Sequence, residues 1–117
     1  MIILADDDAD QRLSLRLALE LEGHDVRAAS NGQAGLTLAG EKLPDVVLID
    51  IGLPDMDGYE VARRLRSALN GRRIGLIALT GFGQPEDQRR AFDAGFDAHL
   101  VKPVSAERLK QVIAELR

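Results

Sequence analysis

The segment Val46-Val47-Leu48-Ile49-Asp50 decides the fold that this sequence predicts. Four branched apolar residues follow one another without a polar break and end on a carboxylate. A run this short and this apolar is typical of a strand buried on both faces, as in a parallel sheet covered by helices. The turn-forming residues of 52–58 come next. Asp50 therefore lies at the carboxyl end of a central strand, the edge at which open α/β sheets bind ligands.

Short apolar segments alternate with amphipathic ones on both sides of this strand. The expected strands are 2–5, 25–29, 46–50, 74–79 and 98–101, and the expected helices cover about 8–22, 31–42, 57–70, 85–95 and 105–116. Strands separated by helices imply a parallel sheet with helices on both faces, and right-handed crossovers leave few topologies. We expect one α/β domain over residues 1–117, with five strands and five helices.

Capping residues mark the expected helix starts. Asp8 with Gln11, and Asp57 with Glu60, have the spacing of capping-box pairs. Ser105 is expected to cap the last helix. The helical periodicity predicts apolar faces made of Leu13, Leu17 and Leu21 in the first helix and of Val61, Leu65 and Leu69 in the third. The arginines at 63, 64 and 66 are expected to form a solvated face.

Composition limits the classes of function. The chain has 117 residues, a net charge of −4, no cysteine and only 3% aromatic residues. It therefore has no disulfide or thiolate metal site, and the absence of a basic block disfavours direct nucleic-acid binding. No apolar run approaches the roughly 18–20 residues of a membrane span, and the N-terminus lacks the features of a signal peptide. We expect a cytoplasmic protein without membrane insertion.

Polar or charged residues stand at the ends of four of the five expected strands. They are Asp6 and Asp7, Asp50, Thr80 and Lys102. Because the ends of parallel strands lie along one edge of a sheet, these side chains can converge. Any one of them alone is more simply a helix cap, a turn residue or a surface lysine; their joint placement at strand ends favours a site.

Three neighbouring carboxylates need a cation or a proton. Two carboxylates about 4 Å apart repel by about 4 kcal/mol at an effective dielectric near 20. Oxygen ligands without cysteine or clustered histidine favour a hard ion, with Mg²⁺ the best fit. A carboxylate can also act as a nucleophile toward phosphorus, and phosphoryl transfer needs charge neutralisation above all. The cluster is suited to phosphate chemistry, with Asp50 as the acceptor.

Several segments together resemble the receiver domain of two-component response regulators. They are Leu4-Ala5-Asp6-Asp7-Asp8, the run 44–54 around Asp50, Met56-Asp57-Gly58, Ala78-Leu79-Thr80-Gly81 and Leu100-Val101-Lys102-Pro103. The resemblance covers essentially the whole chain in the same order and spacing. The residues at 80–83 and 99–103 especially resemble those of receivers attached to hybrid histidine kinases. The resemblance implies a flavodoxin-like sheet of order 2-1-3-4-5 and a cis peptide bond before Pro103.

The resemblance also implies a role for each strand-end residue. Asp50 would accept a phosphoryl group from a phosphohistidine on a histidine kinase or a histidine-phosphotransfer domain. Mg²⁺ would be held by Asp7, Asp50 and the backbone carbonyl of Gly52, with Asp6 acting through water. Lys102 would pair with Asp50 and then with the phosphoryl oxygens. Thr80 would move to hydrogen-bond the phosphoryl group.

Two positions depart from the commonest receiver pattern. The switch position in the last strand, usually Tyr or Phe, is His99, which is expected to report the state of Thr80. The residues two past Asp50 and two past Thr80 are Gly52 and Phe82, and neither is able to position an attacking water. The resemblance makes the surface of the fourth helix, fifth strand and fifth helix the docking face for a downstream protein.

Two other functions remain open on the sequence alone. A Mg²⁺-dependent hydrolase of the haloacid-dehalogenase type would form an aspartyl phosphate, but it needs a second acid where this chain has Gly52. A pseudo-receiver would share the fold and act by binding alone, but such modules lose the acidic pair, the acceptor or the lysine. We expect a phosphoacceptor signalling module with no turnover of external substrates.

Overall fold

The computed structural model describes residues 1–68, 73–81 and 85–116. Strands and helices alternate along this part of the chain. The strands are β1 (Ile2–Ala5), β2 (Val26–Ala29), β3 (Val46–Asp50), β4 (Gly75–Thr80) and β5 (Ala98–Val101). The helices are α1 (Ala9–Leu21), α2 (Gly32–Glu41), α3 (Gly58–Ala68), α4 (Pro85–Ala94) and α5 (Ala106–Leu116). The expected end of the third helix near residues 70–71, and Leu69 in its apolar face, lie outside the described residues.

The strands form one sheet of order β2-β1-β3-β4-β5, and every neighbouring pair is parallel. The expected order is confirmed. β3 is the central strand of this order, and all five of its residues are buried. Its unbroken apolar sequence suits this position, because a central strand is covered by helices on both faces. The order reverses between β1 and β3, so the edge beyond these two strands is the switch point at which such sheets bind ligands.

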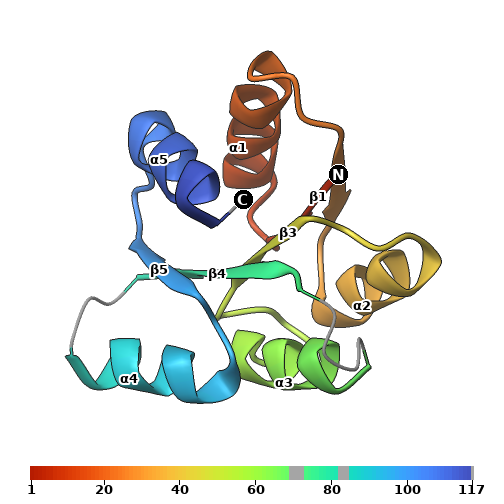
Figure 1. Ribbon diagram of the computed structural model, residues 1–117, viewed down its shortest axis with the longest axis vertical. Helices are drawn as coiled ribbons and strands as arrows, with labels where there is room; N and C mark the ends of the chain where they lie inside the picture. The colour runs from red at the N-terminus through yellow and green to blue at the C-terminus, as the bar shows by residue number, and fades with distance from the viewer. Residues whose placement is uncertain (69–72, 82–84, 117) are drawn as a thin grey trace.

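Two apolar layers fill the space on the two faces of the sheet. In Figure 1, α1 and α5 cover one face, and α2, α3 and α4 cover the other. Strand alternation separates the layers, because Ile3 and Ala5 pack with α2 and α3 while Ile2 and Leu4 pack with α1 and α5. Because helices cover both faces of the sheet, polar functional side chains can gather where the strands end.

The first helix presents a different apolar face from the expected one. Leu13, Leu17 and Leu21 are 57%, 51% and 87% exposed, and the helix packs on the sheet through Leu15 and Leu19. Both series have the same spacing of four residues, so periodicity alone did not distinguish them. The expectation that the first series forms the packed face is wrong.

The expected capping side chains accept from amides in the first turns of their helices, but Glu60, the second member of one expected capping box, accepts from Arg63 and Arg64 instead. Ser105 Oγ accepts from the amide of Arg108 and Asp57 accepts from the amide of Glu60. Asp8 accepts from the amides of Asp10 and Gln11. The amide of Asp8, however, donates to Asp6 Oδ1 at 3.0 Å. The second half of that capping box is therefore absent, because the amide is engaged by a carboxylate of the strand-end cluster.

Arg66 also departs from its expected place on a solvated face. Its guanidinium donates to the backbone carbonyls of Gly95 and Ile74 and pairs with Asp97 at 2.8 Å. These contacts join α3 to the end of α4 and to the start of β4. Arg63 and Arg64 behave as expected, since both are exposed and pair with Glu60.

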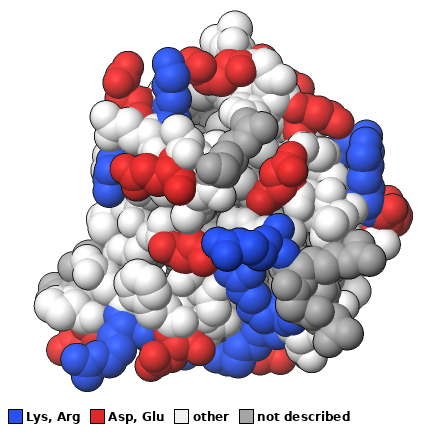
Figure 2. All heavy atoms as spheres, in the orientation of Figure 1, with Lys and Arg blue, Asp and Glu red and all other residues white. Residues whose placement is uncertain are grey.

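The surface carries charges of both signs. On the face in Figure 2, acidic and basic side chains are both present, and uncharged residues separate many of them. That face is therefore not uniformly basic, in keeping with the net charge of −4. None of the described helices is both long and apolar enough to cross a membrane.

Candidate functional site

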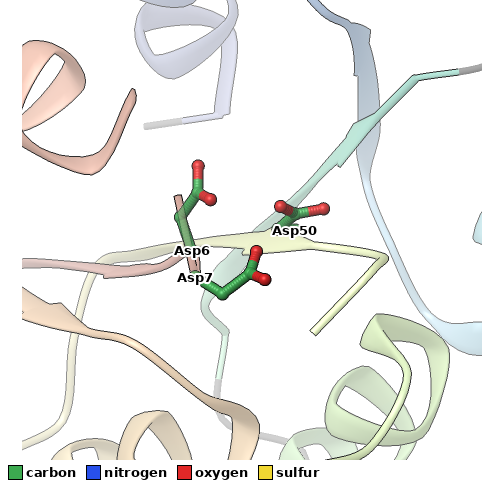
Figure 3. A group of neighbouring side chains, drawn as sticks. All are labelled: Asp6, Asp7 and Asp50. Carbon is green, nitrogen blue, oxygen red and sulfur yellow. The ribbon is translucent and has the colours of Figure 1, made fainter. Parts of the chain in front are cut away.

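The acidic residues predicted to converge do so after the ends of β1 and β3. Asp6 and Asp7 directly follow β1, and Asp50 is the last residue of β3. Figure 3 shows the three carboxylates gathered at this edge. One oxygen from each lies within 4.8 Å of one oxygen from each of the others. The parallel pairing of β1 with β3 brings them together, because Ala5 and Ile49 are partners in register.

Asp50 is held from two sides at the centre of the cluster. It is 5% exposed. Its Oδ1 accepts from the amide of Gly52 at 3.0 Å, and its Oδ2 accepts from Lys102 Nζ at 2.7 Å. The ammonium group offsets the cost of burying this carboxylate. The side chain of Lys102 is 26% exposed, so the pair lies at the border between the core and the solvent.

Asp6 is the most deeply buried member of the cluster, with no exposed surface. Its Oδ1 accepts from the amide of Asp8, whereas its Oδ2 is buried without a hydrogen-bond partner among the described residues. Burial, with the nearby charge of Asp50, raises the pKa of Asp6 to about 6. The ionised form of Asp6 is therefore destabilised in the folded domain, and a nearby cation would stabilise it.

The cluster fits a hard cation by its donor chemistry. Asp7 is exposed while Asp6 and Asp50 are buried, so a cation placed among them would have access to solvent on one side. The unpartnered Oδ2 of Asp6 is an acceptor without a donor. Oxygen ligands and retained waters are the coordination that Mg²⁺ prefers. Gly52 is exposed, and its amide donates to Asp50 Oδ1, so this residue lies next to the cluster.

Thr80 and Lys102 lie at the ends of the two neighbouring strands β4 and β5. The backbone amide of Lys102 donates to the carbonyl of Thr80 at 2.8 Å, and Thr80 is 5% exposed. The peptide bond between Lys102 and Pro103 is cis, as expected. The predicted strand-end residues are therefore neighbours along one edge of the sheet.

His99 lies on the same face of the sheet as Thr80. It pairs in register with Ala78, two residues before Thr80, and side chains two apart share a face. Ala78 packs in the layer that contains α4 residues Ala91 and Ala94. His99 is half-buried, and its Nε2 is buried without a hydrogen-bond partner among the described residues. Phe82 lies outside the described residues.

Two contacts near the cluster were not foreseen from the sequence. Arg12 donates to the backbone carbonyl of Asp6 at 2.8 Å, which fixes the chain where β1 gives way to α1. Asp55 accepts from the amides of Gly32 and Gln33 at 2.7 and 2.8 Å. No sequence motif indicates the contact of Arg12 with a backbone carbonyl. The contact of Asp55 has no local signal either, because its partners are more than twenty residues earlier in the chain.

A family model described as the response regulator receiver domain matches residues 2–114 of this chain. The chain belongs to the response regulator receiver family. This confirms the family that the sequence motifs resembled.

Curated relatives and solved structures agree with this membership. The receiver is 38% identical over 117 residues to the DNA-binding dual master transcriptional regulator RpaA of Synechocystis, covering 99% of this chain and 48% of RpaA. It is 37% identical to an uncharacterized 14.6 kDa protein in the sodA1 3′ region of Leptolyngbya boryana, covering 97% of this chain and 87% of that protein. The chain thus spans about half of RpaA and most of the second relative.

Two solved structures share the fold closely. A CheY-like receiver domain protein from Methanospirillum hungatei has a TM-score of 0.89 at 32% identity, covering 97% of this chain and 90% of that one. The chemotaxis protein CheY4 of Vibrio cholerae has a TM-score of 0.93 at 25% identity, covering 99% of this chain and 97% of that one. The receiver is similar to both over nearly its whole length.

Proposed function

We propose that this receiver domain is a phosphoacceptor whose Asp50 takes a phosphoryl group from a phosphohistidine. A carboxylate oxygen of Asp50 forms a bond to phosphorus, while the bond from phosphorus to the imidazole nitrogen breaks and leaves its electron pair on that nitrogen. The donor would be a histidine kinase or a histidine-phosphotransfer domain. The observation that carries the proposal is the contact of 2.7 Å between Lys102 Nζ and Asp50 Oδ2 inside a cluster of three carboxylates.

The carboxylates would hold Mg²⁺ during this reaction. Asp7, Asp50 and the carbonyl of Gly52 would be direct ligands, and Asp6 would act through a water molecule. The unpartnered Oδ2 of Asp6 supports a cation nearby. When bound, Mg²⁺ would neutralise part of the negative charge on the phosphoryl oxygens. Among the chain's own groups, the ammonium of Lys102 would supply positive charge to those oxygens.

Phosphorylation would then change the surface formed by α4, β5 and α5. Phosphorylation replaces the single negative charge of the Asp50 carboxylate with roughly two negative charges on the phosphoryl oxygens, beside Lys102 and Thr80. Thr80 would turn its hydroxyl toward the phosphoryl oxygens, and His99 would repack on the same face of the sheet. The side chains of Phe92 on α4 and Val101 on β5 are 64% and 43% exposed, which supports this surface as the place where a downstream protein docks. The change is a shift between two populations of the domain.

The domain would not turn over external substrates. An aspartyl-phosphate hydrolase needs a second acid to protonate its leaving group, and the position two after Asp50 is a glycine. Among the described residues, Asp6 and Asp7 are the carboxylates that accompany Asp50 in the cluster. Loss of the phosphoryl group would therefore occur by hydrolysis of the domain's own aspartyl phosphate.

Intact-mass measurement with a small phosphoryl donor tests the proposal. The purified domain is incubated with acetyl phosphate, with Mg²⁺ or with a chelator, and then with a phosphorylated histidine-phosphotransfer protein. The expected result is a gain of one phosphoryl group that needs Mg²⁺ and is absent in Asp50→Asn. Asp57→Asn is the matched control, because Asp57 caps α3 and lies in the same loop. A gain that persists in Asp50→Asn, or no gain from either donor, contradicts the proposal.

A further inference from the structure

The loop between β3 and α3 carries Gly52, and its tip is attached to a different element. At the base of the loop, the amide of Gly58 donates to the carbonyl of Ile51 at 2.9 Å. At the tip, Asp55 accepts from the first two amides of α2, those of Gly32 and Gln33. The residue proposed as a metal ligand therefore lies between two fixed points.

The amides at the start of α2 are shared between a local and a distant acceptor. The first amides of a helix have no partner within it. Asn31, the residue before the helix, accepts from the amide of Ala34 at 2.8 Å. The amides of Gly32 and Gln33 are left, and the two oxygens of Asp55 take one each. The helix start is thus completed only when the loop of residues 51–57 is in place.

Packing and charge support the same attachment. A Cβ added at Gly32 would lie 2.6 Å from Met56 Cγ, so the loop and the helix are in close contact there. The two amide hydrogen bonds, that from Gln33 first, lower the pKa of Asp55 below its ordinary value. A carboxylate is also favoured at the positive end of a helix. Asp55 is exposed, yet its two oxygens are oriented by two adjacent donors.

We propose that Asp55 is a positioning residue that sets the affinity of the acidic cluster for Mg²⁺ by holding the carbonyl of Gly52 in place. The two residues between them transmit the constraint: Pro54 has a fixed φ angle, and Leu53 is 7% exposed. Gly52 itself is conformationally permissive, so its carbonyl depends on the residues that follow. This inference rests on the proposed function of the cluster.

Removal of Asp55 is expected to weaken Mg²⁺ binding about tenfold, the lower end of the range for residues that orient metal ligands. Binding of MgCl₂ alone is followed by isothermal titration calorimetry and by amide chemical shifts, so that no phosphorylation is needed. Asp55→Asn retains one acceptor oxygen and is expected to lose less affinity than Asp55→Ala. The free energy of unfolding without metal is measured for each variant.

Two control variants separate positioning from other effects. Asn31→Ala removes the local cap of α2 but leaves the loop attached, so it should lower stability and leave Mg²⁺ affinity unchanged. Asp10→Asn removes an equal negative charge from an exposed position in the first turn of α1; its effect on affinity measures the charge contribution to be subtracted.

The outcomes distinguish the inference from the proposed function. If the wild-type domain binds Mg²⁺ and Asp55→Ala binds it equally well, the positioning role is wrong and the function stands. The positioning role is also wrong if Asn31→Ala or Asp10→Asn weakens binding as much as Asp55→Ala. If the wild-type domain does not bind Mg²⁺, the proposed function and this inference both fail.

Discussion

At the scale of single residues, Asp6 has the clearest pH dependence. The pKa of Asp6 is about 6 in the folded domain, against 3.8 for an ordinary aspartate. Between these two values the folded state binds more protons than the unfolded state. The free energy of unfolding of the metal-free domain therefore falls as pH rises through this range, and the full cost of ionising Asp6 is present above pH 6.

The substitution Asp6→Asn tests this electrostatic cost. The amide keeps the shape of the side chain and can still accept from the amide of Asp8. We expect the variant to be more stable than wild type by about 2 kcal/mol at about pH 7.5, and this gain to vanish near about pH 4. Urea denaturation in the presence of a chelator measures both values. An equal difference at the two pH values would contradict the assigned pKa.

Single residues also show where sequence reasoning was sufficient. Asp6, Asp7, Asp50, Thr80 and Lys102 were predicted to converge because strand ends in a parallel sheet share an edge, and that rule needs no knowledge of distant contacts. Long-range partners gave no such signal. Asp55 stands in a turn with nothing in its neighbourhood to indicate α2, and Arg66 is one arginine among several until the fold places Gly95 and Asp97 beside it.

At the scale of elements, α1 shows what helical periodicity leaves open. Leu15 and Leu19 face the sheet, while Leu13, Leu17 and Leu21 face solvent. Two apolar series at the same spacing in one helix cannot be ranked from the sequence alone. Strands β1, β3 and β4 were simpler to predict, because a strand buried on both faces needs no choice of face.

Alanine substitutions at two leucines of α1 measure this difference directly. Leu19 is 3% exposed and Leu17 is 51% exposed. We expect Leu19→Ala to lower the free energy of unfolding by about 3 kcal/mol, since it leaves a cavity in the core. Leu17→Ala should lower it by less than about 0.5 kcal/mol. Chemical denaturation gives both values, and the reverse ranking would show that α1 packs through its other face.

Alanine substitutions at two glycines are expected to have opposite effects on the stability of the domain. A Cβ at Gly58 would lie 2.8 Å from Ile51 Cα and 2.9 Å from the carbonyl oxygen of Asp50, whereas a Cβ at Gly40 would meet nothing within 4 Å. We expect Gly58→Ala to destabilise the domain by about 2 kcal/mol, because backbone atoms must shift.

Gly40→Ala should raise stability by about 0.5–1 kcal/mol, because Gly40 lies on the exposed side of α2. Thermal unfolding of the two variants beside wild type measures both effects. If both substitutions destabilise the domain equally, the close approach of Gly58 to the end of β3 is not the cause of the destabilisation by Gly58→Ala.

At the scale of the whole molecule, Lys102 connects the acidic cluster to β5. Its ammonium contacts Asp50 and its amide contacts Thr80. We expect Lys102→Ala to bind Mg²⁺ but to lose the chemical-shift changes in α4, β5 and α5 that phosphorylation causes in the wild type. Lys110→Ala is the control, since Lys110 is exposed and pairs with Glu22, the residue that follows α1. Chemical-shift changes of wild-type size in Lys102→Ala would remove Lys102 from the switch.

The sheet order, the buried strands and the converging edge together make the molecule a scaffold for one carboxylate. In this scaffold, we propose that Asp50 carries the phosphoryl group. Borohydride reduction of the phosphorylated domain converts an aspartyl phosphate to homoserine, and peptide mass spectrometry then locates the modified residue. We predict homoserine at position 50 in the wild-type domain, dependent on Mg²⁺. Homoserine at any other aspartate, with position 50 unchanged, would contradict it.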